Sequence, residues 1–326
     1  MAVEQRYDYI DTLKGGAMIF VVLYHSCFLN AFYCPTTTFV PLFFMVSGFL
    51  FRADISWKSL LLRSLRVLLL PYLVYNILCV ILYNSLHTLG VNMPCKDIVS
   101  IFYTNQAELI PNVTTWYLLV LFEVVLFFKA MSFLIKKFST TLRSIVILLV
   151  SLIVGYVGYM LSRYNISMPY LLQVAFVAVL FFGLGYLFSI LIPKASSRYD
   201  RLGYWSILPM FIIYLLSRGY VSMAAGVYEL SYWRLLVMIV ALFVSQFYLC
   251  KLIGRLPFVT YLGRYSLIVL CTNMLVIPIM MGVALRFFGY DSAVIVSSIA
   301  TLLVIRWLVV PFCIRFMPDV SGIKRV

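Results

Sequence analysis

Charged residues are scarce in this sequence. Only 11% of its 326 residues are charged, against roughly 25% in soluble globular domains, whereas 64% are hydrophobic and 17% are aromatic. This composition excludes an ordinary soluble domain. It predicts an all-α polytopic membrane protein, because a chain in lipid satisfies its backbone hydrogen bonds most simply within its own helices.

Several familiar motifs are also absent. The sequence contains no Walker A loop, no GxGxxG following a strand and no HExxH pair, and its seven cysteines show no metal-binding spacing. ATP-driven transport and zinc-dependent hydrolysis therefore have no support in the sequence, and no metal site is expected. Cys34 and Cys95 fall on the same predicted side of the membrane and would pair only in an oxidising compartment.

No cleavable signal peptide is expected at the N-terminus. Glu4, Arg6, Asp8 and Asp11 precede or begin the first apolar run, and no small-residue cleavage site follows it. The first apolar helix should therefore remain in the protein. We expect it to be part of a single transmembrane domain that covers residues 1–326.

Apolar runs predict a bundle of about ten transmembrane helices. The second and seventh of these runs are short for a full crossing. We place the spans at residues 11–30, 38–51, 61–86, 114–135, 143–162, 170–191, 204–217, 233–251, 266–286 and 292–315.

The basic residues are distributed unevenly between the two sides of this bundle. With a cytoplasmic N-terminus, nineteen of the 25 lysines and arginines fall on the cytoplasmic side, five fall on the other side, and Arg306 lies within a span. This bias follows the positive-inside rule and predicts that both termini are cytoplasmic. The net charge of +14 therefore reports orientation in the membrane, and no nucleic-acid partner is expected.

His25 lies in the first apolar run, eleven residues after Lys14. Eleven residues of α-helix return to within about 20° of the starting direction and advance by roughly 16 Å, so both side chains share one face. An ionisable side chain inside a membrane is costly and often functional. We therefore interpret Lys14 and His25 as the two ends of one ligand site. The alternative is that His25 only packs against a neighbouring helix and hydrogen-bonds to it.

Two arginines stand at the inner end of the third span. Arg63 and Arg66 are three residues apart, so they face the same way on a helix. Two guanidinium groups this close repel each other unless an anion lies between them, and guanidinium binds phosphate in a bidentate fashion. The pair predicts an anion site, with ordinary anchoring at the membrane surface as the alternative.

Glu123 and Arg306 are the other two charges deep inside spans. An unpaired charge at such a depth is costly, so each should have a partner, and we hypothesise that they pair with each other across the bundle. Trp116 and Tyr117 fit either an aromatic belt at the membrane interface or the lining of a substrate groove.

Short segments in order along the chain resemble the membrane acyltransferase-3 family. Lys14 and His25 occupy the positions of the cation and the histidine of that family's first helix. Lys14 stands where many members have arginine, and Asn273 stands where many have a second histidine. The matching segments are RYDYIDTLKGGAMIFVVLYHS (6–26), PLFFMVSGFLFR (41–52), the Arg63/Arg66 pair followed by Pro71, TWYLLVLF (115–122), VAVLFFGLGYLF (177–188) and LGRYSLIVLCTN (262–273).

The resemblance implies a membrane-only O-acyltransferase of the bacterial cytoplasmic membrane. Such a protein moves an acetyl or other acyl group from cytoplasmic acetyl-CoA to a hydroxyl of an envelope glycan or lipid-linked sugar. The resemblance further implies that Lys14, Arg63 and Arg66 hold the CoA phosphates. It implies that His25 is the general base or a transient acyl carrier. Further candidates to support the site or line its groove are Asp11, Ser47, Trp116, Tyr117, Glu123 and Arg306.

A transporter or flippase for an envelope saccharide is the main alternative, because the same charges could line a translocation path. The absence of inverted repeats counts weakly against it. A sensor or scaffold derived from the enzyme is a third interpretation. A sensor or scaffold would have lost the enzyme's activity. This is disfavoured because the chain keeps the whole set of Lys14, His25, Arg63 and Arg66.

Overall fold

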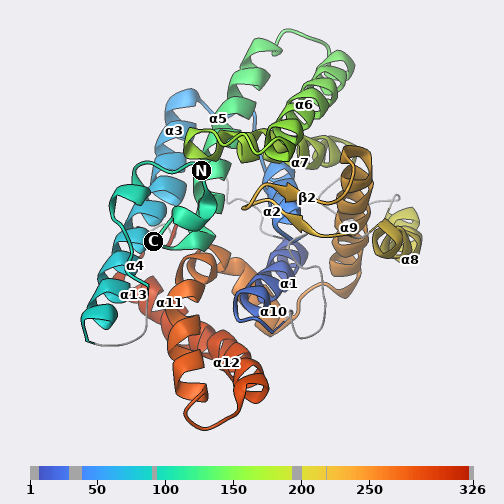
Figure 1. The fold of residues 1–326 in the computed structure, drawn as a ribbon. Helices are drawn as coiled ribbons and strands as arrows, with labels where there is room; N and C mark the ends of the chain where they lie inside the picture. The colour runs from blue at the N-terminus through green and yellow to red at the C-terminus, as the bar shows by residue number, and fades with distance from the viewer. Residues whose placement is uncertain (1–6, 29–38, 90–93, 193–199, 218, 323–326) are drawn as a thin grey trace.

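A computed structural model describes residues 7–28, 39–89, 94–192, 200–217 and 219–322 (Figure 1). This part of the chain is almost entirely helical. The α-helices are α1 (Asp8–His25), α2 (Phe39–Phe49), α3 (Trp57–Ser64), α4 (Leu70–Thr88), α5 (Trp116–Leu134), α6 (Thr140–Arg163), α7 (Leu172–Leu191), α8 (Asp200–Ser217), α9 (Tyr232–Ile253), α10 (Pro257–Arg264), α11 (Ser266–Ala284), α12 (Tyr290–Val304) and α13 (Val310–Phe316).

Each of the ten expected spans coincides with a helix. Seven helices among the described residues are long and apolar enough to cross a membrane. Helix α2 is shorter, with 11 residues, while α1 carries Asp8, Asp11 and Lys14 in its first two turns. These helices confirm an all-α polytopic membrane protein, and the count of ten crossings stays a prediction.

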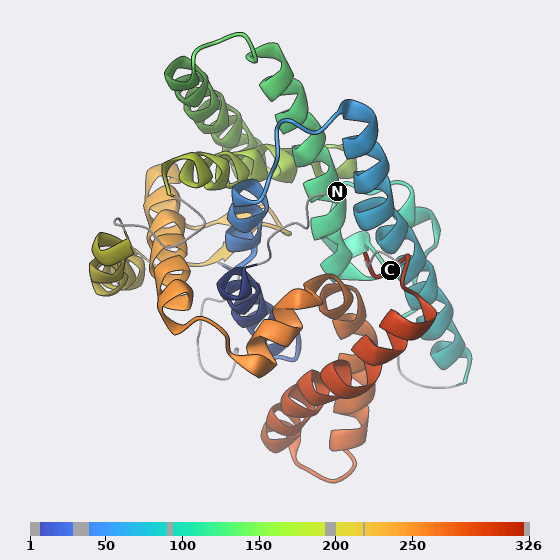
Figure 2. The same ribbon diagram turned by 180° about the vertical axis from the view of Figure 1, so that it is seen from behind.

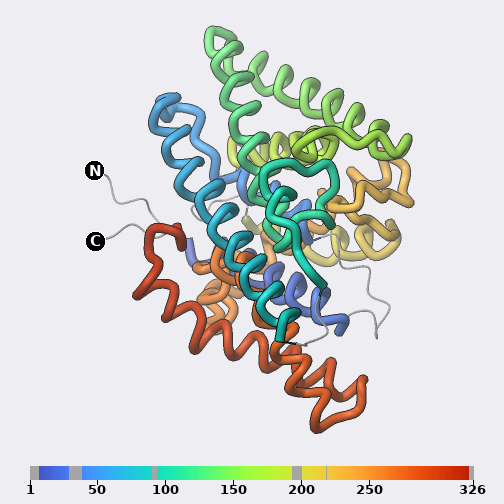
Figure 3. The backbone as a smooth tube through the Cα atoms, turned by 60° about the vertical axis from the view of Figure 1, so that its left-hand side comes forward, coloured from blue at the N-terminus to red at the C-terminus, as the bar shows by residue number. Residues whose placement is uncertain are grey.

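Two long helices contain a π-helical turn just before a proline. The segment η3 (Leu65–Leu69) connects α3 to α4 at Pro71, and η8 (Ile305–Val309) connects α12 to α13 at Pro311. Proline lacks an N–H and collides with the carbonyl four residues earlier, so a wider turn accommodates its ring without ending the helix. Figure 3 follows both helices as long uninterrupted rods.

Helix α1 lies in the middle of the bundle, where it contacts α2, α9, α10 and α11 (Figures 1 and 2). Helix α2 packs in turn against α7, most of which is buried. The α2–α7 contact brings backbone against backbone: a Cβ on Gly48 would collide with the carbonyl of Phe182, and one on Gly185 with that of Met45. Helix α8 stands at the edge, packed against α9.

Connections that were predicted to face the outer side of the membrane form short structured elements. These are the 3-10 turns η4 (Val99–Ile101), η5 (Ala107–Leu109), η6 (Val113–Thr115) and η7 (Pro169–Leu171), and a two-stranded antiparallel hairpin of β1 (Val221–Ser222) and β2 (Val227–Tyr228). Cys34 lies outside the described residues, so its pairing stays a prediction. The thiol of Cys95 lies 3.3 Å from Asn84 Oδ1.

Candidate active site

Helices α1, α2, α5 and α11 and the π-turn η3 enclose a cavity of about 240 Å³. Most of its walls are aliphatic or aromatic, and its polar groups come from a few side chains. The lining residues are Lys14, Met18, Val21, His25, Val40, Phe43, Val46, Ser47, Leu50, Val67, Leu68, Thr114, Trp116, Tyr117, Leu118, Leu121, Ser266, Leu267 and Leu270.

Lys14 and His25 both line this cavity, from opposite ends of α1. Their shared face is the one expected from a spacing of eleven residues. His25 is half-buried at the last position of α1, with its ring 5.3 Å from that of Tyr24. Among the described residues, no side chain makes a recorded hydrogen bond to its imidazole. A nitrogen of this ring is therefore available to a ligand.

Ser47, Trp116 and Tyr117 lie together on the wall formed by α2 and α5. The hydroxyls of Ser47 and Tyr117 are 3.1 Å apart, and the Tyr117 ring packs 4.7 Å from that of Phe44. Trp116 is only 6% exposed, so it is not a residue of an interfacial belt. All three side chains line the groove.

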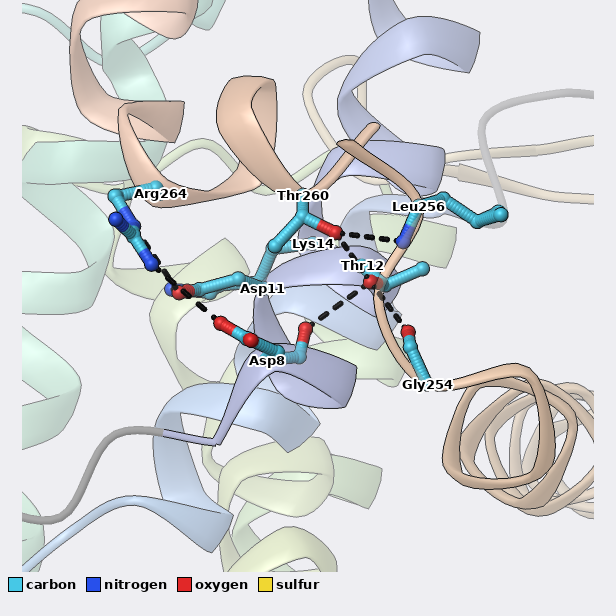
Figure 4. Close-up of polar contacts among 8 residues, drawn as sticks. All are labelled: Asp8, Asp11, Thr12, Lys14, Gly254, Leu256, Thr260 and Arg264. Carbon is cyan, nitrogen blue, oxygen red and sulfur yellow. Dashed lines mark hydrogen bonds and ion pairs between the residues drawn. The ribbon is translucent and has the colours of Figure 1, made fainter. Parts of the chain in front are cut away.

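In the first two turns of α1, acidic and basic side chains form a cluster with Arg264 (Figure 4). Lys14 Nζ lies 2.8 Å from Asp11 Oδ1. Arg264 of α10 reaches Asp11 at 4.0 Å and Asp8 at 3.4 Å. Lys14 is thus held in place by Asp11 rather than left as a free positive charge.

The same end of α1 is fastened to α10 by a buried hydroxyl pair. Thr12 Oγ1 lies 2.8 Å from Thr260 Oγ1 and donates to the Gly254 carbonyl at 2.9 Å (Figure 4). The backbones also touch, because a Cβ on Gly15 would collide with the carbonyl of Val259. Helix α10 thus fixes the position of the Asp11–Lys14 pair.

Arg63 and Arg66 flank the cavity without lining it. Val67 and Leu68, which directly follow Arg66, form part of the cavity wall. Arg63 is exposed, whereas Arg66 forms an exposed ion pair with Asp319 near the end of the chain. The neighbouring Gly322 lies against Leu267 and Val67, both cavity residues, so the C-terminal segment covers this side of the site.

The hypothesis that Glu123 pairs with Arg306 is wrong. The Arg306 guanidinium stacks on the Tyr261 ring at 3.9 Å and lies 5.5 Å from the Phe258 ring, so aromatic faces take the place of a carboxylate. Its turn, η8, packs against α11, α12 and α13, whereas Glu123 belongs to α5, which packs against α7 and η3. Glu123 Oε2 is buried without a hydrogen-bond partner among the described residues, and neither Glu123 nor Arg306 lines the cavity.

Sequence reasoning missed two charged residues of this region, Arg264 and Asp319. Arg264, in the segment LGRYS, enters the sequence analysis as one of the cytoplasmic basic residues and as part of the resemblance, and Asp319 lies in a short polar tail. A further buried polar residue is Asn273 on α11, whose amide has no hydrogen-bond partner among the described residues. It is fully buried and does not line the cavity.

The fold and the cavity together define a polytopic helical membrane protein with an internal ligand site. His25 and Lys14 line this site from different turns of α1, and Arg66 lies next to the part of its wall formed by Val67 and Leu68.

The chain belongs to the acyltransferase-3 family, because the family model described as an acyltransferase domain matches residues 7–314, nearly its full length. It is therefore a membrane acyltransferase. Comparisons with curated proteins and with solved structures gave no match.

Proposed function

We propose that this protein is an O-acyltransferase that takes an acetyl group from cytoplasmic acetyl-CoA and places it on a hydroxyl of an envelope glycan or lipid-linked sugar. The main support is that His25 and Lys14 line one cavity whose wall continues directly into Arg66. The phosphates of the donor would lie at the arginines, where charge-assisted hydrogen bonds are strong. Its thin pantetheine arm would extend through the apolar cavity toward His25.

The chemistry requires one proton acceptor near the thioester. As a general base, neutral His25 takes the proton of the acceptor hydroxyl while the oxygen attacks the thioester carbon. The C–S bond then breaks, and the thiolate receives that proton and leaves as free CoA. In the other route the imidazole nitrogen itself attacks the carbonyl, CoA leaves, and the acceptor hydroxyl then takes the acyl group from nitrogen.

The proposed location is the cytoplasmic membrane of a bacterium, with ten crossings and both termini inside. This orientation puts Lys14, Arg63 and Arg66 on the cytoplasmic side, where acyl-CoA is found. It puts His25 nearer the outer side, where envelope glycans are assembled. The uneven distribution of basic residues supports this arrangement.

Turnover of labelled acetyl-CoA by the purified protein in proteoliposomes tests the proposal. An acyltransferase should release free CoA and place label on glycan extracted from cells that lack the protein. A saccharide transporter should leave the thioester intact. Failure of the wild-type protein to consume acetyl-CoA in the presence of that glycan would contradict the proposal.

Replacing Arg63 or Arg66 with alanine should raise the apparent KM for acetyl-CoA by about tenfold or more, because each loses a charge-assisted hydrogen bond to phosphate. The value of kcat should change little, since the arginines bind the phosphates equally well in the ground state and in the transition state. The Arg52→Ala variant is the control, because Arg52 is also an exposed arginine on the same predicted side. An unchanged KM in both variants would mean that the two arginines only anchor their helix at the membrane surface.

Replacing Asp319 with asparagine should shift the KM for acetyl-CoA in the opposite direction. Asp319 competes with phosphate for Arg66, and an exposed pair of this kind contributes up to about 1 kcal/mol, so KM should fall by up to about fivefold. Asp54→Asn is the matched control, because it removes another exposed pair, with Arg52. An increase in KM specific to Asp319→Asn would mean that the ion pair organises the donor site.

A further inference from the structure

A second pocket, unlike the first, lies among the outer connections. Its volume is about 290 Å³. Three separate parts of the chain build it: the segment around η5, the end of α6 with the start of α7, and the turn of the β-hairpin. The lining residues are Asn105, Gln106, Ala107, Glu108, Ser162, Asn165, Ile166, Ser167, Gln173, Ala224, Ala225 and Gly226.

The lining is rich in groups that both donate and accept hydrogen bonds. Four of the twelve side chains are amides and two are hydroxyls. A carboxylate, Glu108, adds acceptor oxygens, and none of the lining residues that the structure describes is a lysine or arginine. Alcohol groups of a ligand also donate and accept, so this set suits a polyhydroxylated ligand and disfavours an anion. The small side chains of the hairpin turn leave room beside these groups.

The backbone around the pocket is held in a defined shape. The Tyr170 N–H donates to the Thr104 carbonyl at 2.6 Å, which joins the α6–α7 connection to the segment before η5. Gln173 Oε1 accepts from the Met168 N–H at 2.9 Å. Asn165 has a positive φ of 55°, a conformation that asparagine adopts more readily than most residues.

The backbone of the α6–α7 connection, which forms part of the pocket, is also strained. Tyr170 and Leu171 have φ values of 58° and 66°, which bulky side chains rarely adopt. Backbone strain of this kind persists only where the surroundings impose it, and it gathers at functional sites. Tyr170 is also exposed, and its ring lies 6.2 Å from that of the exposed Tyr103.

The polar pocket lies at the His25 end of the apolar cavity. His25 ends α1 on the predicted outer side, where the connections that build the pocket also lie. The turn η5, which carries Glu108, contacts η6, whose Thr114 lines the cavity. Along the chain, the segment that carries Glu108 continues into Thr114 and Trp116, which line the cavity. A ligand in the pocket would therefore lie near the end of α1 where the imidazole is found, on the side opposite the arginines.

We propose that this polar pocket binds the saccharide body of the acyl acceptor while one of its hydroxyls reaches His25. This inference rests on the proposed acyl transfer and assigns the acceptor a site of its own, separate from the donor cavity. The amides and Glu108 would select neutral, polyhydroxylated acceptors. The acyl-CoA would contact none of these residues.

Two substitutions test the pocket in the full-length protein. Ala225→Trp places a large side chain in it from the exposed hairpin turn, and Glu108→Gln removes the only charge among its described lining residues. Ala225→Trp should raise the KM for glycan extracted from cells that lack the protein by at least tenfold, and Glu108→Gln should raise it severalfold. The KM for acetyl-CoA should stay at the wild-type value in both, which also shows that the variants are folded.

Matched controls lie close by in the same connections. Val227→Trp adds the same bulk to an exposed position of the hairpin that does not line the pocket, and Asp97→Asn neutralises another exposed outer carboxylate. Both should keep the wild-type KM for glycan. A wild-type KM for glycan in Ala225→Trp and Glu108→Gln, with transfer intact, overturns the pocket assignment alone. Absence of transfer by the wild-type protein overturns the proposed function instead.

Discussion

Replacing His25 with glutamine or alanine is expected to reduce kcat for acyl transfer by at least about 100-fold, the usual scale for loss of a general acid–base group. The KM for acetyl-CoA should change little, because the proposed phosphate-binding residues, Arg63 and Arg66, lie away from His25. Glutamine keeps hydrogen-bonding capacity and polarity but supplies neither a basic nitrogen nor a nucleophile. The measurement is release of CoA and transfer of label by purified protein in proteoliposomes.

The second histidine of the chain provides the control. His87 is exposed near the end of α4 and does not line the cavity. His87→Gln should therefore keep wild-type kcat. Equal yields of folded, membrane-inserted protein for wild type and both His25 variants would exclude a defect in insertion. Full activity in either His25→Gln or His25→Ala would overturn the catalytic role.

A single-turnover experiment separates the two routes for His25. With labelled acetyl-CoA and no acceptor, a transient acyl carrier should retain label on the protein, and His25→Gln should not. A general base should leave the wild-type protein unlabelled while its transfer to glycan still requires His25. The open nitrogen of the imidazole is compatible with both routes, so the decision lies with this measurement.

The helices were predictable because long apolar runs report burial in lipid directly. The shared face of Lys14 and His25 was also predictable, since both belong to one helix and its period relates them. Helix α10 could not be predicted from the sequence, because Pro257–Arg264 is short and of mixed polarity. The π-turns were missed as well. A shift in the hydrogen-bond register leaves no periodic trace in the sequence, and Pro71 and Pro311 gave the only hint.

Pairings between distant parts of the chain were beyond sequence reasoning. Arg264 meets Asp8 and Asp11 from more than 250 residues away, and Arg66 meets Asp319 from a similar distance. Each contact depends on how the helices pack. The mistaken Glu123–Arg306 pair shows the same limit. Arg306 has a partner, but it is the Tyr261 ring, whereas Glu123 Oε2 has no hydrogen-bond partner among the described residues.

Replacing Gly15 with alanine is expected to destabilise the protein by roughly 1–3 kcal/mol or more, the range for overpacking a close contact. The added methyl group would collide with the backbone carbonyl of Val259, which cannot rotate away as a side chain could. Helix α1 would then have to separate from α10, which would disturb the Asp11–Lys14 pair and the Thr12–Thr260 hydroxyl pair. The measurement is thermal unfolding of the purified protein in detergent.

The next residue of the same helix supplies a control with the opposite expected sign. A Cβ on Gly16 would meet no atom within 4 Å, so Gly16→Ala should be neutral or stabilising, by up to about 1 kcal/mol from helix propensity. The two variants add the same methyl group to adjacent positions, so their difference isolates the contact with α10. Equal melting temperatures would contradict the close packing. A lower melting temperature for Gly15→Ala alone, with a higher KM for acetyl-CoA, would tie the α1–α10 contact to the donor end of the site.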